Sequence, residues 1–171
     1  DHLHKEITAV SVSATETEIT IQTKAVFFPM NENCHVEPLL TTETRYRINS
    51  SRMTISNQVI NCCDIDTLAR IGLSFRLDSR FDQLSWYGKG PWETYADRKH
   101  SALTGCYHST VKEQHIPFVR PCECGGHEDT RYAHISDGVH SVQIIGDQDF
   151  HFSALPYSME EYQTAMYDND L

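Results

Sequence analysis

The chain has 171 residues, 39% of them hydrophobic, and a formal net charge of −10 at pH 7. The length suits one domain with a sizeable core, and the composition is that of a globular protein, not a disordered one. A surface this acidic repels phosphate backbones, so we expect no nucleic-acid partner. The apolar stretches are only a few residues long and no signal peptide is visible, so we expect no membrane partner either.

The cysteines do not form a recognisable framework. None of the six forms a CxxC pair, and the adjacent Cys62-Cys63 and the Cys122-Glu123-Cys124 step are unusual for a disulfide-stabilised domain of this size. We therefore expect reduced thiols and a cytoplasmic protein. The cysteines are Cys34, Cys62, Cys63, Cys106, Cys122 and Cys124.

The dominant period along the chain is two, which is typical of half-buried β-strands. In chain order, the segments that alternate or read as short strands are 18–27, 36–48, 53–59, 71–77, 84–86, 142–145 and 150–152. Residues 71–77 and 84–86 flank a turn-like stretch and are expected to pair. Turn residues separate most of the other segments, and helical periodicity is almost absent. The pattern predicts an all-β, antiparallel sandwich in a single domain, 1–171.

Two segments depart from this pattern. Ser158 is followed three residues later by Glu161, a capping box that predicts a short helix reaching about Met166. Residues 88–126 hold three of the six prolines and mix aromatic with charged side chains. Long irregular segments in compact β domains are often functional or interfacial, so we look for a site there.

The most informative stretch is residues 86–99. Gly88 and Gly90 permit backbone conformations that a Cβ would forbid, and Pro91 ends the strand. Downstream, carboxylates and an arginine are close enough in sequence to form an ion network that pins the loop. The residues of this network are Glu93, Asp97 and Arg98.

Several segments resemble one known family. Residues 88–98 resemble the G-x-G-P-x-E-x-Y-x-D-R signature in the C-terminal, small-chain domain of β-galactosidases of glycoside hydrolase family 2. Before it, 69–75 resemble the family's R-I-G-L strand. After it, 117–126 resemble Y-x-x-P-Q-E-N-G, and 129–132 an acidic-x-arginine-aromatic step. The residues that carry these motifs are Gly88, Gly90, Pro91, Glu93, Asp97, Arg98, Pro121, Gly126 and Arg131.

The resemblance implies a twisted antiparallel supersandwich like that of galactose mutarotases, with one short helix near the C-terminus. It also implies a truncated domain, because the R-A-P-x-D-N-D-like opening and the tryptophan-bearing segment after the helix are not found. Phe118, Cys122 and Cys124 replace the usual tyrosine, glutamine and asparagine. The two cysteines remove side-chain amides that could bond sugar or backbone.

The chain offers no catalytic pair. A retaining glycosidase needs two carboxylates about 5 Å apart, and the resemblance places them on a separate (β/α)₈ barrel. Such a barrel takes about 250 residues. The resemblance also implies that the parent enzyme uses Mg²⁺ and Na⁺, with no cofactor in this chain. A zinc site at Cys122, Cys124, His127 and His134 is disfavoured, because C-x-C is shorter than zinc-ligand spacing.

We therefore expect a non-catalytic part of a β-galactosidase that supports the catalytic barrel and shapes its sugar site. Its partners would be the remainder of that enzyme or a second copy, with galactosides as ligands. The candidate sugar-binding residues are Trp92, Tyr95, Arg120 and Glu123. A free-standing carbohydrate-binding module and a mutarotase-like protein are the alternatives.

Overall fold

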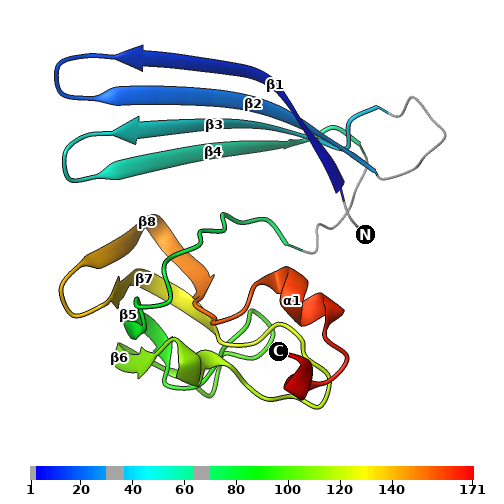
Figure 1. Ribbon diagram of the computed structural model, residues 1–171, viewed down its shortest axis with the longest axis vertical. Helices are drawn as coiled ribbons and strands as arrows, with labels where there is room; N and C mark the ends of the chain where they lie inside the picture. The colour runs from blue at the N-terminus through cyan, green and yellow to red at the C-terminus, as the bar shows by residue number, and fades with distance from the viewer. Residues whose placement is uncertain (1–2, 30–36, 64–69) are drawn as a thin grey trace. The chain divides into compact units, whose positions relative to one another are not determined.

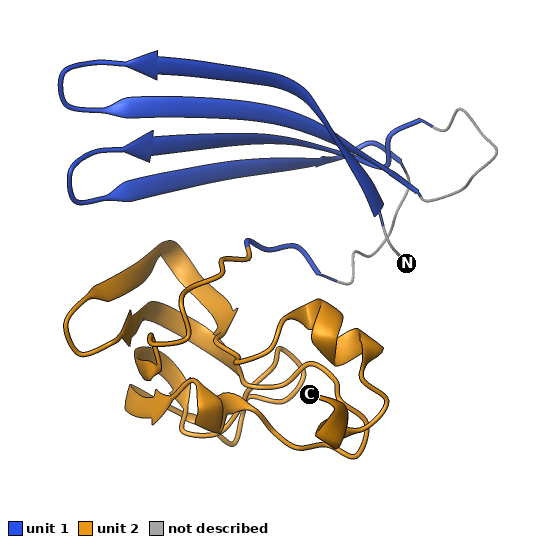
Figure 2. Ribbon diagram, in the orientation of Figure 1, with its two compact units in different colours: residues 1–73 blue, residues 74–171 orange. Residues whose placement is uncertain are grey.

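The computed structural model describes residues 3–29, 37–63 and 70–171. The chain forms two compact units, residues 1–73 and 74–171 (Figure 2). Each unit holds one four-stranded antiparallel sheet (Figure 1). The predicted all-β fold class, with one short helix near the C-terminus, is confirmed. A single domain over 1–171 stays a prediction, and the two units are described separately.

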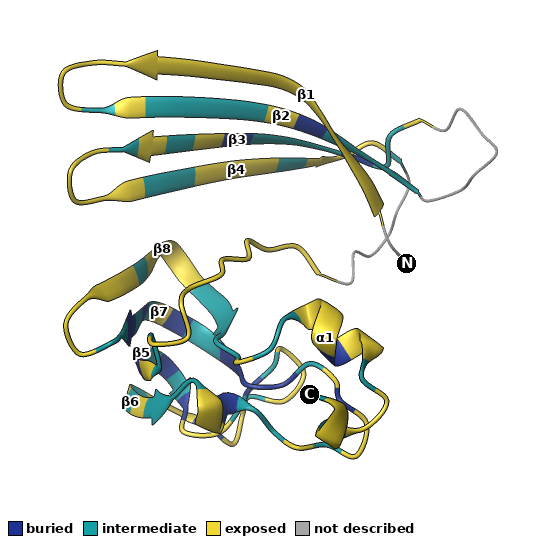
Figure 3. Cartoon of the chain, in the orientation of Figure 1, coloured by how far each residue is buried: buried dark blue, intermediate teal, exposed yellow. Residues whose placement is uncertain are grey.

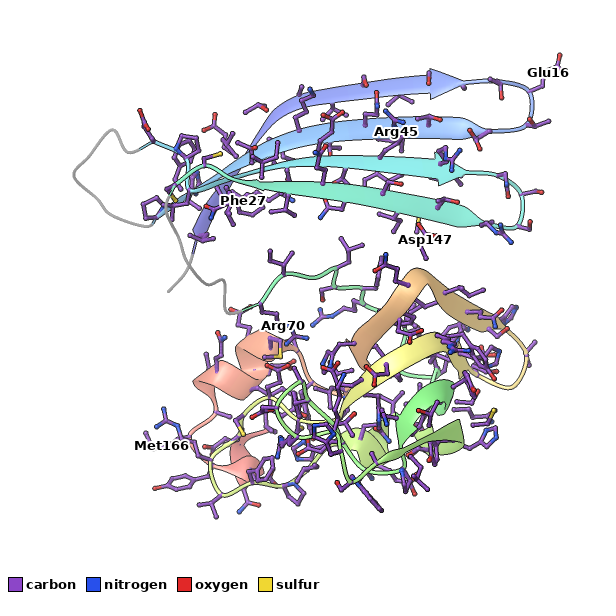
Figure 4. All side chains as sticks on the ribbon, turned by 180° about the vertical axis from the view of Figure 1, so that it is seen from behind. Glu16, Phe27, Arg45, Arg70, Asp147 and Met166 are labelled. Atoms are coloured by element: carbon purple, nitrogen blue, oxygen red, sulfur yellow. The ribbon has the colours of Figure 1, made fainter. Side chains whose placement is uncertain are left out.

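The first unit is a meander of neighbouring strands in the order β1-β2-β3-β4. These strands are β1 (Leu3–Ala14), β2 (Ile19–Pro29), β3 (Leu40–Ile48) and β4 (Met53–Asn61). Glu16 lies in the turn between β1 and β2 (Figure 4). The alternation predicted β2, β3 and β4 at nearly these bounds, although Val36 lies outside the described residues. It did not predict β1, whose pairing with β2 carries an irregularity between Ile7 and Ala9.

Near the β1–β2 and β3–β4 turns, the first sheet has one apolar and one polar face. Directly opposed residues of paired strands share a face, so the register places Val12, Ile21, Tyr46 and Ile55 together. The next row on the other face is Ser11, Gln22, Arg45 and Ser56. Burial is slight in this unit, and β1 is exposed along its whole length (Figure 3). Its described buried residues are Ala25, Leu40 and Thr44.

The second unit carries a sheet in the order β6-β5-β7-β8. Its strands are β5 (Gln83–Gly90), β6 (Leu103–Thr110), β7 (Gly126–Ser136) and β8 (Ser141–Ser153). Alternate residues of the two central strands form a buried core cluster of Leu84, Trp86, Ala133 and Ile135. The core of this unit therefore lies on one face of β5 and β7.

Helical structure is short. The elements are the 3₁₀-helix η1 (Lys112–Gln114), α1 (Met159–Thr164) and the 3₁₀-helix η2 (Asp168–Asp170). The predicted capping box is confirmed: Ser158 N–H donates to Glu161 Oε2 at 2.6 Å, and Glu161 N–H donates to Ser158 Oγ at 3.3 Å. Among the described residues, no helix has the length and apolarity needed to cross a bilayer.

Three sequence predictions are corrected. Residues 71–77 form no strand and are exposed throughout. Their expected partner, β5, pairs with β6 on one side and β7 on the other, so neither edge is free for them. The segments at 142–145 and 150–152 belong to one strand, β8, because irregular pairing with β7 accommodates the residues between them. The irregular stretch 88–126 contains β6 and opens β7.

Candidate functional site

The site is built on the end of β5, where two glycines allow other chain segments to approach closely. A Cβ on Gly88 would stand 2.5 Å from Thr130 Oγ1 and 2.8 Å from Thr130 Cα. A Cβ on Gly90 would stand 2.7 Å from the Tyr107 ring. Both contacts are too short for real atoms, so these positions must be glycine for β5 to sit against β6 and β7.

The loop that follows β5 is tied to the start of β7 through Thr94, which is fully buried. Thr94 N–H donates to Gly126 O at 2.7 Å, and Glu128 N–H donates to Thr94 Oγ1 at 2.8 Å. Arg98 N–H then closes a turn onto Tyr95 O at 2.9 Å. Backbone hydrogen bonds, shielded from water, thus fix the loop that contains Trp92.

An ion pair lies across this loop. Arg98 Nη2 is 2.9 Å from Glu93 Oε1, and the other oxygen of Glu93 accepts the Gly125 N–H at 3.0 Å. The Glu93 side chain is only 12% exposed, whereas that of Arg98 is 55% exposed. Asp97 is exposed and forms no ion pair with any described residue. The predicted network is therefore a single pair whose carboxylate is buried and additionally hydrogen-bonded.

Tyr95 packs within the loop. The guanidinium carbon of Arg98 lies 4.6 Å from the centre of the Tyr95 ring, and the ring centre of His151 lies 5.5 Å away. Burial, followed by the negative charge of Glu93, raises the pKa of the Tyr95 hydroxyl. These contacts make Tyr95 part of the loop's interior scaffold, with limited ring surface left for a ligand.

The other candidate sugar-binding residues lie at different depths. The Trp92 side chain projects from the fixed loop and is 55% exposed. Arg120 is exposed, whereas Glu123 is half-buried and lies close enough to raise the pKa of Tyr95. Gly126 is buried, and a Cβ there would stand 2.5 Å from the His151 ring. Pro121 is buried as well. Trp92 is thus the exposed aromatic of this set.

Two further ion pairs and a histidine–carboxylate hydrogen bond surround the start of β7. Lys99 Nζ lies 2.6 Å from Asp129 Oδ1, and this hydrogen bond raises the pKa of Lys99. His151 Nδ1 lies 2.9 Å from Glu128 Oε1. Arg131 Nε lies 3.4 Å from Asp149 Oδ1. These pairs link the Trp92 loop, β7 and β8, so the loop is held on a rigid base.

Two of the residues that the sequence offered for zinc, Cys124 and His127, make other contacts. Cys124 Sγ–H donates to Tyr162 Oη at 3.8 Å. His127 is 1% exposed, packs against Trp86 in a tilted arrangement with ring centres 4.0 Å apart, and its Nε2 lies 2.6 Å from Gln114 Oε1. No group of three or more His, Cys, Asp or Glu side chains in the described part of the chain could hold a metal ion.

Comparison with protein families matches residues 1–171, the whole chain, to the family described as "Beta galactosidase small chain". The chain belongs to the β-galactosidase small-chain family. The loop with Trp92, Glu93 and Arg98 is therefore a feature of a small-chain domain.

The relatives of this small-chain domain are much longer proteins. It is 35% identical to a β-galactosidase of Vibrio cholerae over 77% of this chain and 12% of that protein. It is 32% identical to a β-galactosidase of Priestia megaterium over 94% of this chain and 15% of that protein. A third relative, β-galactosidase BgaC of Bifidobacterium adolescentis, is 37% identical over 63% of this chain and 11% of its own length. The chain thus spans a small fraction of each relative.

Sequence reasoning did not find several residues that build this small-chain site. Thr94, Gln114 and His151 look ordinary in the sequence, because their partners lie 13 to 34 residues away. In the sequence, His127 stands out only as a candidate metal ligand. A buried histidine hydrogen-bonded to a distant amide leaves no local pattern, so only the folded chain reveals it.

Proposed function

We propose that this chain is the non-catalytic β-sheet portion of a larger β-galactosidase, an enzyme that hydrolyses terminal β-D-galactosides such as lactose. The observation that carries the proposal is the family match over residues 1–171, joined to relatives named β-galactosidase of which the chain covers 11 to 15%. The described fold supports the non-catalytic role. It consists of antiparallel sheets with one six-residue α-helix, not alternating strands and helices.

Within that enzyme we assign the Trp92 loop to the sugar site. Trp92 is exposed, yet the loop beneath it is fixed by the buried Thr94 and by the Glu93–Arg98 pair. Aromatic faces stack on the apolar C–H surface of sugar rings, and a rigid support lowers the entropic cost of that contact. Arg120 and Glu123 are the polar groups proposed to lie along the same sugar.

The test uses a family β-galactosidase from which the segment matching this chain has been deleted. We expect the isolated chain to leave a chromogenic β-galactoside intact, the deleted enzyme to be weakened or inactive, and addition of the chain to restore part of its activity. Turnover by the chain alone that disappears when one of its own carboxylates is mutated would contradict the proposal. In the full enzyme, Trp92→Ala should raise KM more than Val119→Ala, a matched change at another exposed residue.

The carbohydrate-binding module remains the second candidate, and the exposed Trp92 is the observation that favours it. Calorimetry of the isolated chain with galactose and lactose separates the two functions. A free-standing module should bind without any partner, whereas a supporting domain should need the rest of the enzyme to complete the site.

A cytoplasmic location is part of the same proposal. The described cysteines, Cys62, Cys63, Cys106, Cys122 and Cys124, are all free thiols, and Cys62, Cys106 and Cys122 are exposed. Exposed thiols persist in a reducing compartment. Thiol counting on protein taken rapidly from cells, without added reductant, tests this assignment.

A further inference from the structure

One histidine anchors residues 158–171 to the rest of the second unit. His115 follows η1, and its Nδ1 lies 2.7 Å from Tyr162 Oη, while its Nε2 lies 2.8 Å from Asp168 Oδ1. Tyr162 belongs to α1 and Asp168 to η2. We call residues 158–171 the strap. Tyr162 and Asp168, one from each helical element of the strap, thus both hydrogen-bond to the imidazole ring of His115.

The hydrogen bonds around this ring form a continuous chain. A carboxylate can only accept, so His115 Nε2–H donates to Asp168 and the bare Nδ1 accepts the Tyr162 hydroxyl. The Tyr162 oxygen in turn accepts Cys124 Sγ–H at 3.8 Å. Burial, and then the Cys124 thiol, raises the pKa of Tyr162, which keeps the hydroxyl protonated. With a neutral His115 ring and a Cys124 thiol, every donor in this series of hydrogen bonds faces an acceptor.

Apart from this anchor, much of the strap is exposed to solvent. Tyr162 is 2% exposed, but Met166 is 68% and Tyr167 57% exposed, and Met166 projects outward in Figure 4. The six residues of α1 are too few for a stable isolated helix. Several other bonds, such as Tyr167 N–H to Asp170 Oδ2 at 2.8 Å, lie within the strap and do not attach it to the unit. Segments with few buried contacts open locally before the whole unit unfolds.

We propose that the strap is a detachable cover, latched by His115, whose opening uncovers the Cys124 thiol. Cys124 is 0% exposed, and Tyr162 of the strap is its hydrogen-bond partner. The next residue, Gly125, donates its N–H to Glu93, so Cys124 directly precedes a residue that holds the ion pair of the Trp92 loop.

Thiol alkylation measures this opening. When Cys124 is uncovered, its thiolate displaces iodide from iodoacetamide, forming a thioether while the thiol proton goes to the buffer. Mass spectrometry of the peptide reports Cys124, with the exposed Cys122 as an internal reference. In the native chain, we expect Cys124 labelling to depend only weakly on urea below the unfolding transition. A steep dependence, with the slope of global unfolding, would overturn the proposal because Cys124 would then open only with the whole unit.

Substitutions identify the latch. His115→Ala should raise the Cys124 labelling rate at least about ten-fold, the effect of losing a hydrogen bond to a charged partner, and leave Cys122 unchanged. Asp168→Asn, which preserves the ring, should give a smaller increase. Lys112→Ala, at an exposed residue of η1, is the matched control and should have no effect. Unchanged protection of Cys124 in both latch variants would overturn the assignment of His115.

Discussion

At the scale of single residues, a half-exposed cation can keep a buried anion in place. Glu93 is shielded by the loop around it and has two partners, the Arg98 guanidinium and the Gly125 amide. Removing Arg98 leaves the carboxylate with the amide alone. The cost falls between that of an exposed pair, at most about 1 kcal/mol, and that of a buried one, about 3–5 kcal/mol.

We therefore expect Arg98→Ala to lower the free energy of unfolding by about 1–2 kcal/mol, because one partner of the pair is half-exposed. Urea denaturation monitored by Trp fluorescence is the measurement. Asp97→Ala and Arg120→Ala, at exposed residues of the same unit, serve as controls and should change little. A melting curve of Arg98→Ala that overlays that of the parent chain would show that Gly125 alone satisfies Glu93.

His127 makes the stability of the second unit depend on pH. Burial lowers its pKa from 6.5 to about 4, although the Lys89 carbonyl favours the protonated form. Between pH 6.5 and about pH 4, the His127 imidazole is therefore neutral in the folded chain and charged in the unfolded chain. Stability from this group is complete above pH 6.5 and is lost as the pH falls from 6.5 toward 4.

The loss attributable to His127 across that window should be on the order of 3 kcal/mol. Urea unfolding at a series of pH values should show a flatter pH dependence for His127→Gln than for the parent chain. Carboxylates that titrate in the same range are common to both proteins and cancel in the comparison. His100→Gln, at an exposed histidine, should keep the parent's slope. Identical slopes for His127→Gln and the parent chain would contradict the buried neutral state.

At the scale of elements, β5 is the strand on which the site depends. It pairs on both sides, with β6 and with β7, and the Trp92 loop follows directly. The close approach of Thr130 to Gly88 sets how closely β7 can pack against β5.

Gly88→Ala should therefore lower the free energy of unfolding by about 1–3 kcal/mol, the usual range for overpacking a core. Its added methyl group would meet both backbone and side-chain atoms of Thr130, which cannot move independently. Gly72→Ala is the matched control, since a Cβ there has no neighbour within 4 Å. Thermal melts of both variants test the argument, and equal melting temperatures would show that the strands can shift apart without cost.

At the scale of the whole molecule, the two units differ in how much they bury. The second holds Trp86, at 1% exposed, within a cluster that spans β5 and β7. The first is a single sheet. Its described buried residues are Ala25, Leu40 and Thr44, none of which is aromatic. A single sheet does not supply a core of its own, because its apolar face must pack on another layer.

Expressed separately, residues 74–171 should melt cooperatively, whereas residues 1–73 should stay unfolded or self-associate through the apolar face. Calorimetry and sedimentation velocity measure the two outcomes. Within residues 1–73, Val12→Lys on the apolar face should reduce association, and Ser11→Lys on the polar face should not. A monomeric, cooperative melt of 1–73 would show that this sheet is stable without a cover.

Local sequence determined much of the chain. Alternation located β2, β3 and β4, because a half-buried strand must alternate whatever its neighbours are. The capping box located α1 because its hydrogen bonds lie within four residues. The Glu93–Arg98 pair was foreseen for the same reason, since its partners are five residues apart.

Tertiary structure decided the rest. Residues 71–77 alternate as strictly as any strand, yet a strand exists only where a neighbour accepts its hydrogen bonds, and both edges of β5 are taken. His115 and Tyr162 are 47 residues apart, and His127 meets Gln114 only after the chain has folded. Pairing and burial are properties of distant segments brought together, so a one-dimensional pattern does not contain them.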